Sequence, residues 1–221
     1  MSLQVWKGKS PITGDPIVGL VTWGSENPKT GDVDTLWILH DKASPTEAVR
    51  TGADRAVCGD CPHRHHTGGG CYVVPFHAPA MAWKSRGKAG KRRPSTAIRL
   101  GGYGDPGMIP APALKKIVGR RLASVGYTHQ WRRLRAGHRR LLMASADTLQ
   151  DAKDAWAKGW RTFRILGKNE EPMPNEIICP NTTHGVTCKE CRLCDGSKGL
   201  DDRRKSITIR PHGSFVRRFD V

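Results

Sequence analysis

The sequence predicts an α/β fold in which a parallel sheet, open or curled into a partial barrel, follows an N-terminal β hairpin and precedes a cysteine-rich segment. From residue 77 onward, helix-like and strand-like stretches alternate along the chain. The connections between them are short enough for parallel βα units. The chain also contains 25 Gly and 15 Pro among 221 residues, so much of it must form turns and loops. That composition excludes a simple helical bundle.

The first part of the chain, residues 1–53, is predicted to be a β-rich extension. Residues 3–7, 17–23 and 34–40 have the composition of strands, and turn-forming residues separate the last two. The run Ser44-Pro-Thr-Glu47 matches a capping box with proline at the first helical position. A short helix is therefore expected to begin there, to end near Gly52 and to lead into Cys58.

Residues 54–175 are predicted to hold the βα units, and residues 176–221 a C-terminal cysteine-rich segment. The apolar residues of 111–125 recur at the helical period, with Gly126 as the expected stop. Asp147 or Thr148 is expected to cap a later helix. The expected order is a helix at 77–88, a strand at 96–100, a helix at 111–125, strands at 127–129 and 141–145, a helix at 148–158 and a strand at 160–166.

All seven cysteines fall into two groups, which predict metal sites. Cys58, Cys61 and Cys71 lie in the run CGDCPHRHHTGGGC, which also carries His63, His65 and His66. Paired CxxC spacing without a signal peptide favours metal ligation over disulfides. Three thiolates suit a [4Fe–4S] cluster with one open iron, whereas a structural zinc ion needs a fourth ligand, here one of the histidines. Spacing alone leaves both metals open.

The second group consists of Cys179, Cys188, Cys191 and Cys194. Four thiolates are enough to close a zinc knuckle or to hold a second cluster. His184 or His212 could replace one thiol. The pattern therefore predicts a metal site in this segment without deciding between zinc and iron.

Polar segments follow three of the predicted strands, and ligands of parallel α/β sheets bind at the carboxyl ends of strands. The segments are GGYGDP, THQW and ASADT. In them Asp105 offers a carboxylate beside bare glycine backbone, and His129 and Asp147 are candidate catalytic groups. The structural alternatives are a glycine turn with Asp105 as a helix cap, a capping Asp147 and a structural His129.

The charge of the chain predicts an anionic partner. Its 37 Lys and Arg against 20 Asp and Glu give a formal net charge of +17, concentrated at 84–93, 115–121, 132–140 and 203–205. Clustering of this kind favours a nucleic-acid-binding face, with a solvated basic surface as the alternative. No apolar run is long enough for a membrane span, so no membrane partner and a cytoplasmic location are expected. The oligomeric state is left open.

These motifs together resemble the radical S-adenosylmethionine (SAM) enzymes, and most closely a compact phage-encoded family of that kind. The resemblance rests on a three-cysteine loop, a strand ending in GGYGDP, the runs THQW, ASAD and GWRTFR, and CKECRLC near the end. It implies a partial (βα)6-type barrel with an open [4Fe–4S] cluster on Cys58, Cys61 and Cys71. The cysteine spacing of two and nine residues differs from the CxxxCxxC usual in these enzymes.

The resemblance also implies the cofactor, the partner and the reaction. Gly101, Gly102 and Asp105 would face the methionine part of SAM, and Ser145 and Asp147 the rest of the nucleoside. The expected activity is radical chemistry on a modified base in phage DNA, such as isomerisation of an amino-acid-substituted thymidine during thymidine hypermodification. Two other functions are weighed: a zinc-stabilised DNA-binding protein without catalysis, and a zinc-containing base-exchange transglycosylase with Asp105 or Asp147 as nucleophile.

Overall fold

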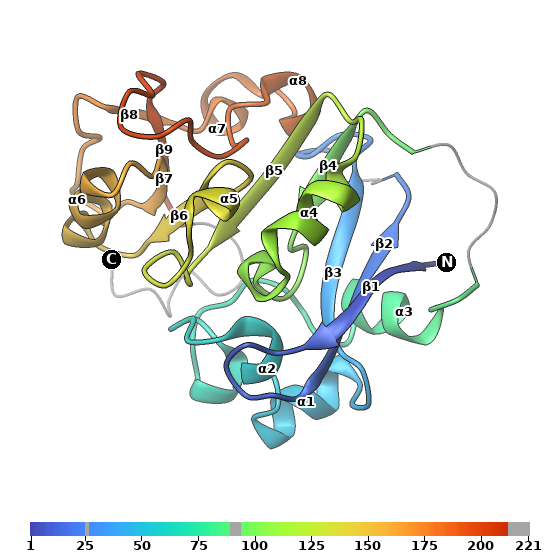
Figure 1. Cartoon of the computed structure of the whole chain (residues 1–221). Helices are drawn as coiled ribbons and strands as arrows, with labels where there is room; N and C mark the ends of the chain where they lie inside the picture. Colours follow the sequence, from blue (N-terminus) through green and yellow to red (C-terminus); the bar gives the residue numbers. More distant parts are fainter. Residues whose placement is uncertain (25–26, 89–93, 212–221) are drawn as a thin grey trace.

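The structure, a computed structural model, describes residues 1–24, 27–88 and 94–211, and places nine strands in one sheet (Figure 1). His212 and residues 89–93, which include three basic residues of the run 84–93, lie outside the described residues. The sheet has the spatial order β1-β2-β3-β4-β5-β6-β7-β9-β8. The strands are β1 (Leu3–Lys9), β2 (Pro16–Thr22), β3 (Asp34–His40), β4 (Ala97–Leu100), β5 (Ala123–Thr128), β6 (Met143–Ala146), β7 (Thr162–Ile165), β8 (Glu176–Ile178) and β9 (Ser206–Ile209).

The helices lie in the connections between these strands. They are α1 (Pro45–Thr51), α2 (Arg55–Cys58), α3 (Ala78–Lys84), α4 (Ala111–Val118), α5 (Ala136–Arg139), α6 (Leu149–Ala157), α7 (Pro180–His184) and α8 (Cys188–Cys191). Two 3-10 turns, η1 (His65–Thr67) and η2 (Pro106–Met108), complete the set within the described ranges. No helix in these ranges has the length and apolar character needed to cross a membrane.

The sheet is mixed but mostly parallel, which confirms the α/β prediction. β1, β2 and β3 pair antiparallel, so the predicted N-terminal hairpin is present. From β3 through β7 every neighbouring pair is parallel, and β9 and β8 continue in the same direction. β1 and β8 are the two outer strands, so the sheet is open. Strands from all three predicted parts of the chain belong to it.

The apolar side chains of β2 and β3, which stand in continuous runs, form the centre of the hydrophobic core. Strands buried on both faces carry such runs, rather than an alternation of apolar and polar residues. Side chains of both strands pack with those of β4 and of the segment that leads into α4. The fully buried members include Ile17, Leu20, Leu36, Ile38, Leu39, Ile98, Leu100, Met108, Ile109 and Leu114.

The predicted helix at 111–125 is too long, because Gly119 ends α4. Gly119 has φ +60°, and its N–H bonds to the Lys115 carbonyl as the helix cap. The helical period of the apolar residues continues past this point by coincidence. Leu122 is 69% exposed, and Val125 belongs to β5. Gly126 is also inside β5 rather than at a helix end; an added Cβ there would lie 2.7 Å from Leu142.

Two helix starts agree with the expected caps. The Ser44 hydroxyl accepts a hydrogen bond from the Glu47 N–H at 3.3 Å and begins α1. Thr148, rather than Asp147, caps α6 in a capping box with Asp151. The Asp147 carboxylate is therefore directed to other partners, described below. The predicted helix at 77–88 is present as the shorter α3.

The two cysteine-rich segments lie at opposite ends of the sheet (Figure 1). α1 and α2 follow the carboxyl end of β3, and they lead into the loop 58–71. α8 contacts the loop before β3, where the Cys188 and Lys189 N–H groups donate to the carbonyls of Lys29 and Thr30, each at 3.1 Å. The cysteines of loop 58–71 are thus near the carboxyl ends of the parallel strands, and those of the C-terminal segment are near the amino ends.

Candidate functional site

The loops that follow three parallel strands meet at one edge of the sheet. The Asp105 N–H, after β4, donates to the Val57 carbonyl at 2.7 Å, one residue before Cys58. The Gln130 side chain, after β5, donates to the Cys58 carbonyl at 3.3 Å. The cysteine loop, the GGYGDP turn and the THQW segment are therefore neighbours, as the parallel order of the strands predicts.

The thiols of Cys58, Cys61 and Cys71 lie within electrostatic reach of one another. All three are free and only partly exposed. Burial raises the pKa of Cys58 well above its usual range and that of Cys71 to about 11. Thiols with raised pKa values are protonated at neutral pH, so a metal would have to displace their protons. The buried Tyr103 hydroxyl lies beside the Cys58 sulfur.

The three sulfurs are not gathered closely enough to be the ligands of one formed zinc site, and whether the loop binds zinc or a cluster stays a prediction. Thiolates about 2.3 Å from a tetrahedral zinc ion are about 3.8 Å apart. Among the described residues, which include every cysteine, the one set of three possible ligand atoms within 4.8 Å of one another contains no sulfur. In a cubane cluster each thiolate binds a different iron, and the sulfurs are further apart.

The three loop histidines, proposed as alternative zinc ligands, each bond to a different part of the fold. His65 Nε2 lies 2.6 Å from the Val73 carbonyl, and His66 Nδ1 lies 2.9 Å from the Val49 carbonyl of α1. His63 Nε2 lies 2.8 Å from Asp147 Oδ1, after β6. These contacts fasten the cysteine loop to α1, to the segment that follows it and to the sheet.

The GGYGDP turn packs against β3 so closely that only glycine fits. The N–H groups of Gly101 and Gly102 both donate to the Leu36 carbonyl, at 3.1 and 2.8 Å. A Cβ on Gly102 would lie 2.4 Å from Thr35, and one on Gly104 would lie 2.4 Å from the Ile38 carbonyl oxygen. These glycines therefore have a packing role, and contact of Gly101 and Gly102 with a cofactor stays a prediction.

Asp105 braces the turn that follows β4 against the loop that follows β5. Its Oδ1 accepts the Gly107 N–H at 2.7 Å and caps η2, and its Oδ2 accepts the His129 N–H at 2.8 Å. Burial raises the pKa of this carboxyl, although hydrogen bonds from Thr128, Gly107 and His129 oppose the rise. The capping role is thus present, and a cofactor-binding role for Asp105 stays a prediction.

His129 and Asp147, the two candidate catalytic residues, are in direct contact. His129 Nε2 lies 3.3 Å from the same Asp147 Oδ1 that contacts His63. Burial opposes protonation of His129, but its contacts with Asp147 and Cys61 raise its pKa well above the usual range. Burial alone would raise the pKa of Asp147, and the two imidazoles hold it well below its usual range. His129 and Asp147 therefore form an ion pair beside Cys61.

Ser145 lies on β6, two residues before Asp147, and is partly buried. Its carbonyl accepts the Trp131 indole N–H at 3.1 Å. In the register of the sheet it is paired with Phe163 of β7. Its expected contact with the nucleoside stays a prediction.

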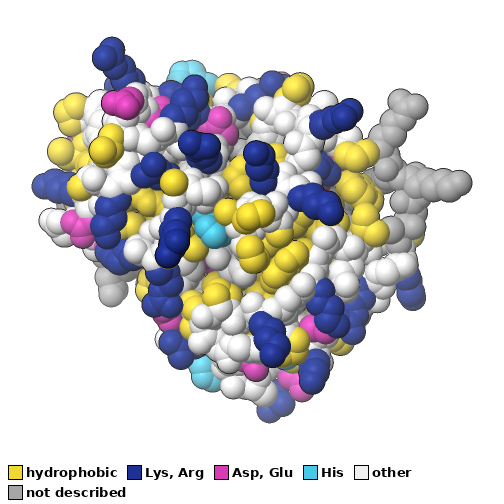
Figure 2. Space-filling view, viewed as in Figure 1, with side chains coloured by type: hydrophobic (Ala, Val, Ile, Leu, Met, Phe, Trp, Pro, Cys, Tyr) yellow, Lys and Arg dark blue, Asp and Glu magenta, His cyan; other side chains and the backbone are white. Residues whose placement is uncertain are grey.

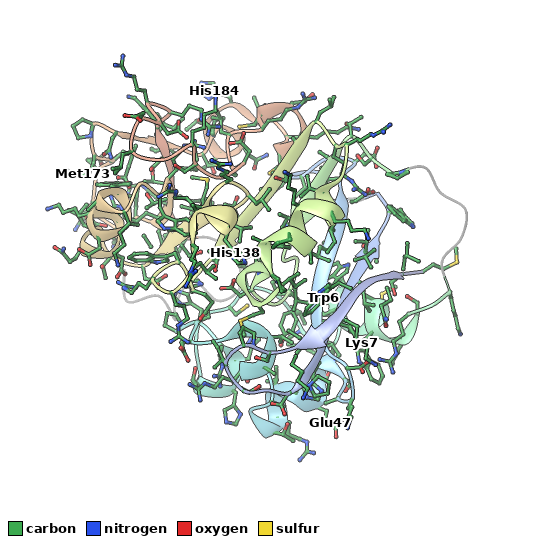
Figure 3. The ribbon with its side chains drawn as sticks, viewed as in Figure 1. Trp6, Lys7, Glu47, His138, Met173 and His184 are labelled. Atoms are coloured by element: carbon green, nitrogen blue, oxygen red, sulfur yellow. The ribbon has the colours of Figure 1, made fainter. Side chains whose placement is uncertain are left out.

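The second cysteine group gathers near the amino ends of the strands. Electrostatic influence of Cys179, Cys188 and Cys191 reaches Cys194, which is buried against Val125, Met143 and Ile207. Burial raises the pKa of Cys194 to about 12. His184, a possible substitute ligand, bonds to Thr183 at 2.6 Å and lies on the outside of α7 (Figure 3). In the described part of the chain no three of these sulfurs lie within 4.8 Å of one another, and a metal site in this segment stays a prediction.

Arg99 of β4 lies between the two cysteine groups and was missed by sequence reasoning. Its charge influences both Cys71 and Cys188. Its guanidinium donates to the Tyr72 hydroxyl, which immediately follows Cys71. On the other side Tyr127 of β5 contacts Cys194. The signal was the alternation in AIRL, which puts Arg99 on the opposite face of β4 from Ile98 and Leu100.

The site thus joins three spaced thiols, a bare glycine turn and a His–Asp–His cluster at one edge of the sheet. These groups can supply thiolate ligands, imidazole and carboxylate ligands, or a charged pair for proton transfer. Comparison of the chain with protein-family models, with curated proteins and with solved structures finds no match.

Proposed function

We propose that the chain is a radical SAM enzyme that modifies a base in DNA. Its [4Fe–4S] cluster would be bound by Cys58, Cys61 and Cys71 within a partial (βα)6-type barrel. The observation that carries this proposal is the position of the three thiols beside the Asp105 turn: the Asp105 N–H donates to Val57, next to Cys58. If the thiols lay on the far side of the sheet from this turn, they would be far from the loops that are proposed to bind the cofactor.

The order of the loops supports the same proposal. The cysteine loop follows the first strand of the parallel series, β3, and the glycine turn follows β4. THQW begins at the last residue of β5, and ASADT begins within β6 and continues past its end. In the resembling enzymes a three-cysteine loop and a GGE-like strand end face one mouth of a partial barrel. The neighbouring loops here would provide the equivalent edge.

When bound, the cluster would supply the electron that cleaves the sulfonium of SAM, giving a radical able to remove hydrogen from an inert carbon. The chain itself would provide orientation and exclude water. Cys58 and Val73 pack against the apolar core that contains Val57 and Tyr103, so the inner side of the cysteine loop borders apolar side chains. Asp105 fixes the backbone of His129, so the imidazole is held beside Cys61.

A DNA substrate is supported by the surface around α4 and α5. Figure 2 shows lysine and arginine side chains around an apolar area in this region, and Figure 3 places His138 beside it. An open hollow here is lined by Lys9, Ile12, Met108, Arg133, Leu134 and His138. Exposed Lys115, Lys116, Arg120, Arg135 and Arg140 lie on the same two helices or next to them. Such side chains contact phosphates without sequence preference.

The decisive experiment is anaerobic reconstitution with iron and sulfide, followed by SAM and a one-electron reductant such as dithionite. The wild-type chain should become brown, bind about four irons for each cluster, and cleave SAM to 5′-deoxyadenosine. Cys61→Ala should lose this cleavage. As a matched control, Cys191→Ala should keep it, provided that the chain remains folded. A reconstituted wild-type sample that leaves SAM intact would reject the proposal.

Metal analysis of protein purified without reconstitution separates this function from the zinc alternatives. A non-catalytic zinc protein would be colourless, with about two zinc ions for the two cysteine groups. A transglycosylase would release a free base from DNA. Observing either result together with intact SAM would favour that alternative.

A further inference from the structure

Three metal-binding side chains converge on one point from separate parts of the chain. His63 comes from the cysteine loop, His129 from the loop after β5, and Asp147 from the loop after β6. One ligand atom from each lies within 4.8 Å of the other two. The side chains are 21%, 21% and 27% exposed, so the cluster is partly buried but reachable from solvent.

From this geometry we propose that His63, His129 and Asp147 bind a single first-row divalent metal ion, separate from any metal on the thiols. Ligands about 2.1 Å from an ion are about 3.0 Å apart at right angles and about 3.4 Å apart at the tetrahedral angle. The two nitrogen-to-carboxylate distances, 2.8 and 3.3 Å, are close to these values. Two imidazoles and one carboxylate with remaining open positions form a ligand set typical of non-haem Fe(II) and related ions.

The backbone of each ligand residue is fixed independently of the others. The Asp105 carboxylate accepts the His129 N–H at 2.8 Å, and the Asp151 carboxylate accepts the Asp147 N–H at 3.2 Å. The His63 carbonyl accepts the Cys71 N–H at 3.0 Å. Ligands held in place before binding lose little conformational freedom when the ion enters, which is the arrangement expected of a metal site.

The neighbouring thiols do not belong to this group. Cys61 contacts His129, but no set of three ligand atoms within 4.8 Å includes a sulfur in the described part of the chain. The site therefore offers nitrogen and oxygen ligands alone. Its ion would differ from the metal of the cysteine loop in ligand type and in chemical environment.

This inference does not depend on the radical SAM proposal. Hydrogen bonds between two imidazoles and a carboxylate could produce the same distances without an ion. The two interpretations differ in one property, which is whether the chain binds a metal through nitrogen and oxygen at this place. The test must therefore detect the ligand type, because the thiols also bind metals.

Cadmium NMR on the full chain makes this distinction, since thiolate-bound cadmium resonates far downfield of cadmium bound by nitrogen and oxygen. With cadmium in excess over all cysteines, the wild-type chain should give one protein-bound signal in the nitrogen–oxygen range, separate from the signal of free cadmium in the same buffer. That signal should be lost in His63→Gln and in Asp147→Asn. His66→Gln, which changes another histidine of the same loop, is the matched control and should keep it.

A second measurement on the wild-type chain covers the case in which a variant fails to fold. Proton–nitrogen correlation spectra should show the Nε2 resonances of two histidines shifting when cadmium binds. Thiolate-range signals alone in the wild type, or a nitrogen–oxygen signal that survives both His63→Gln and Asp147→Asn, would overturn the proposal. SAM cleavage is irrelevant to either outcome, so failure of the radical SAM proposal would be seen separately.

Discussion

Replacing Asp105 by asparagine tests whether this residue is a brace of the site. Both oxygens of the carboxylate accept backbone N–H groups, from Gly107 at 2.7 Å and from His129 at 2.8 Å, and the residue is only 7% exposed. Asparagine keeps one acceptor oxygen and turns an NH₂ group toward the other N–H. One buried N–H group then has no acceptor, which costs about 1–3 kcal/mol of unfolding free energy.

The charge of the buried carboxylate refines that magnitude. Burial raises the pKa of Asp105, so the ionised carboxylate is itself costly in this position, and the neutral amide removes that cost. The expected loss for Asp105→Asn is therefore near the lower end, about 1 kcal/mol. Asp105→Ala leaves both N–H groups without an acceptor and should cost about twice as much or more.

Urea unfolding of the metal-free chain measures these differences, with the slope against urea expected to be unchanged. Asp60→Asn is the matched control, because the Asp60 side chain is 41% exposed and pairs with Arg55 and Arg133 at the surface. That change should cost no more than about 1 kcal/mol. If Asp105→Asn and Asp105→Ala were both as stable as the wild type, the bracing argument would be refuted, and a role in cofactor binding would become the better explanation.

Three further outcomes follow from other contacts. Arg164→Ala should cost about 3–5 kcal/mol in urea unfolding, because it leaves the fully buried Glu176 carboxylate, now bonded at 2.9 and 2.8 Å, without its partner; no loss of stability would contradict it. Arg204 holds the pKa of Asp202 well below its usual range. The wild type should therefore be more stable than Asp202→Asn above about pH 4, and this difference should vanish as the pH falls further. Unfolding curves of both chains across that pH range measure it. Arg135→Ala with Arg140→Ala should weaken DNA binding and reduce the logarithmic salt slope by about 0.9 for each lost phosphate contact, as measured by fluorescence anisotropy; an unchanged slope would exclude this face.

The strands were predictable where apolar runs are long, and the end of α1 at Gly52 was predicted, whereas the end of α4 was not. IVGLV and LWIL identify β2 and β3 because both strands are buried on both faces. The helical period across 111–125 suggested one long helix, since Leu122 and Val125 continue it by chance. Gly119, which stops α4, carried no apolar signal and was overlooked. β8 and β9 were missed because short strands in a cysteine-rich segment have little periodic pattern.

The ligands of the site were easier to predict than its supporting contacts. Asp105, His129 and Asp147 are chemically distinctive and follow strand ends, so the sequence predicts that they are neighbours, whereas Cys58 follows a helix and its place beside them came from the structure. The pairing of His63 with Asp147 could not be predicted, because it joins residues 84 positions apart through a loop without regular structure. Nothing in the sequence distinguishes His63 from His65 and His66, whose ring nitrogens bond to backbone carbonyls.

The position of Arg99 gives a physical reason why two thiol groups can occupy one face of the same sheet. Register pairs Arg99 with Thr35 and Val125, so its side chain shares a face with Tyr127, two residues after Val125. Thiolates at both ends of this partly buried face would repel each other. A guanidinium stays charged in such surroundings, and Arg99 influences Cys71 at one end and Cys188 at the other. A neutral side chain here would leave both thiol groups harder to ionise, and therefore harder to load with metal.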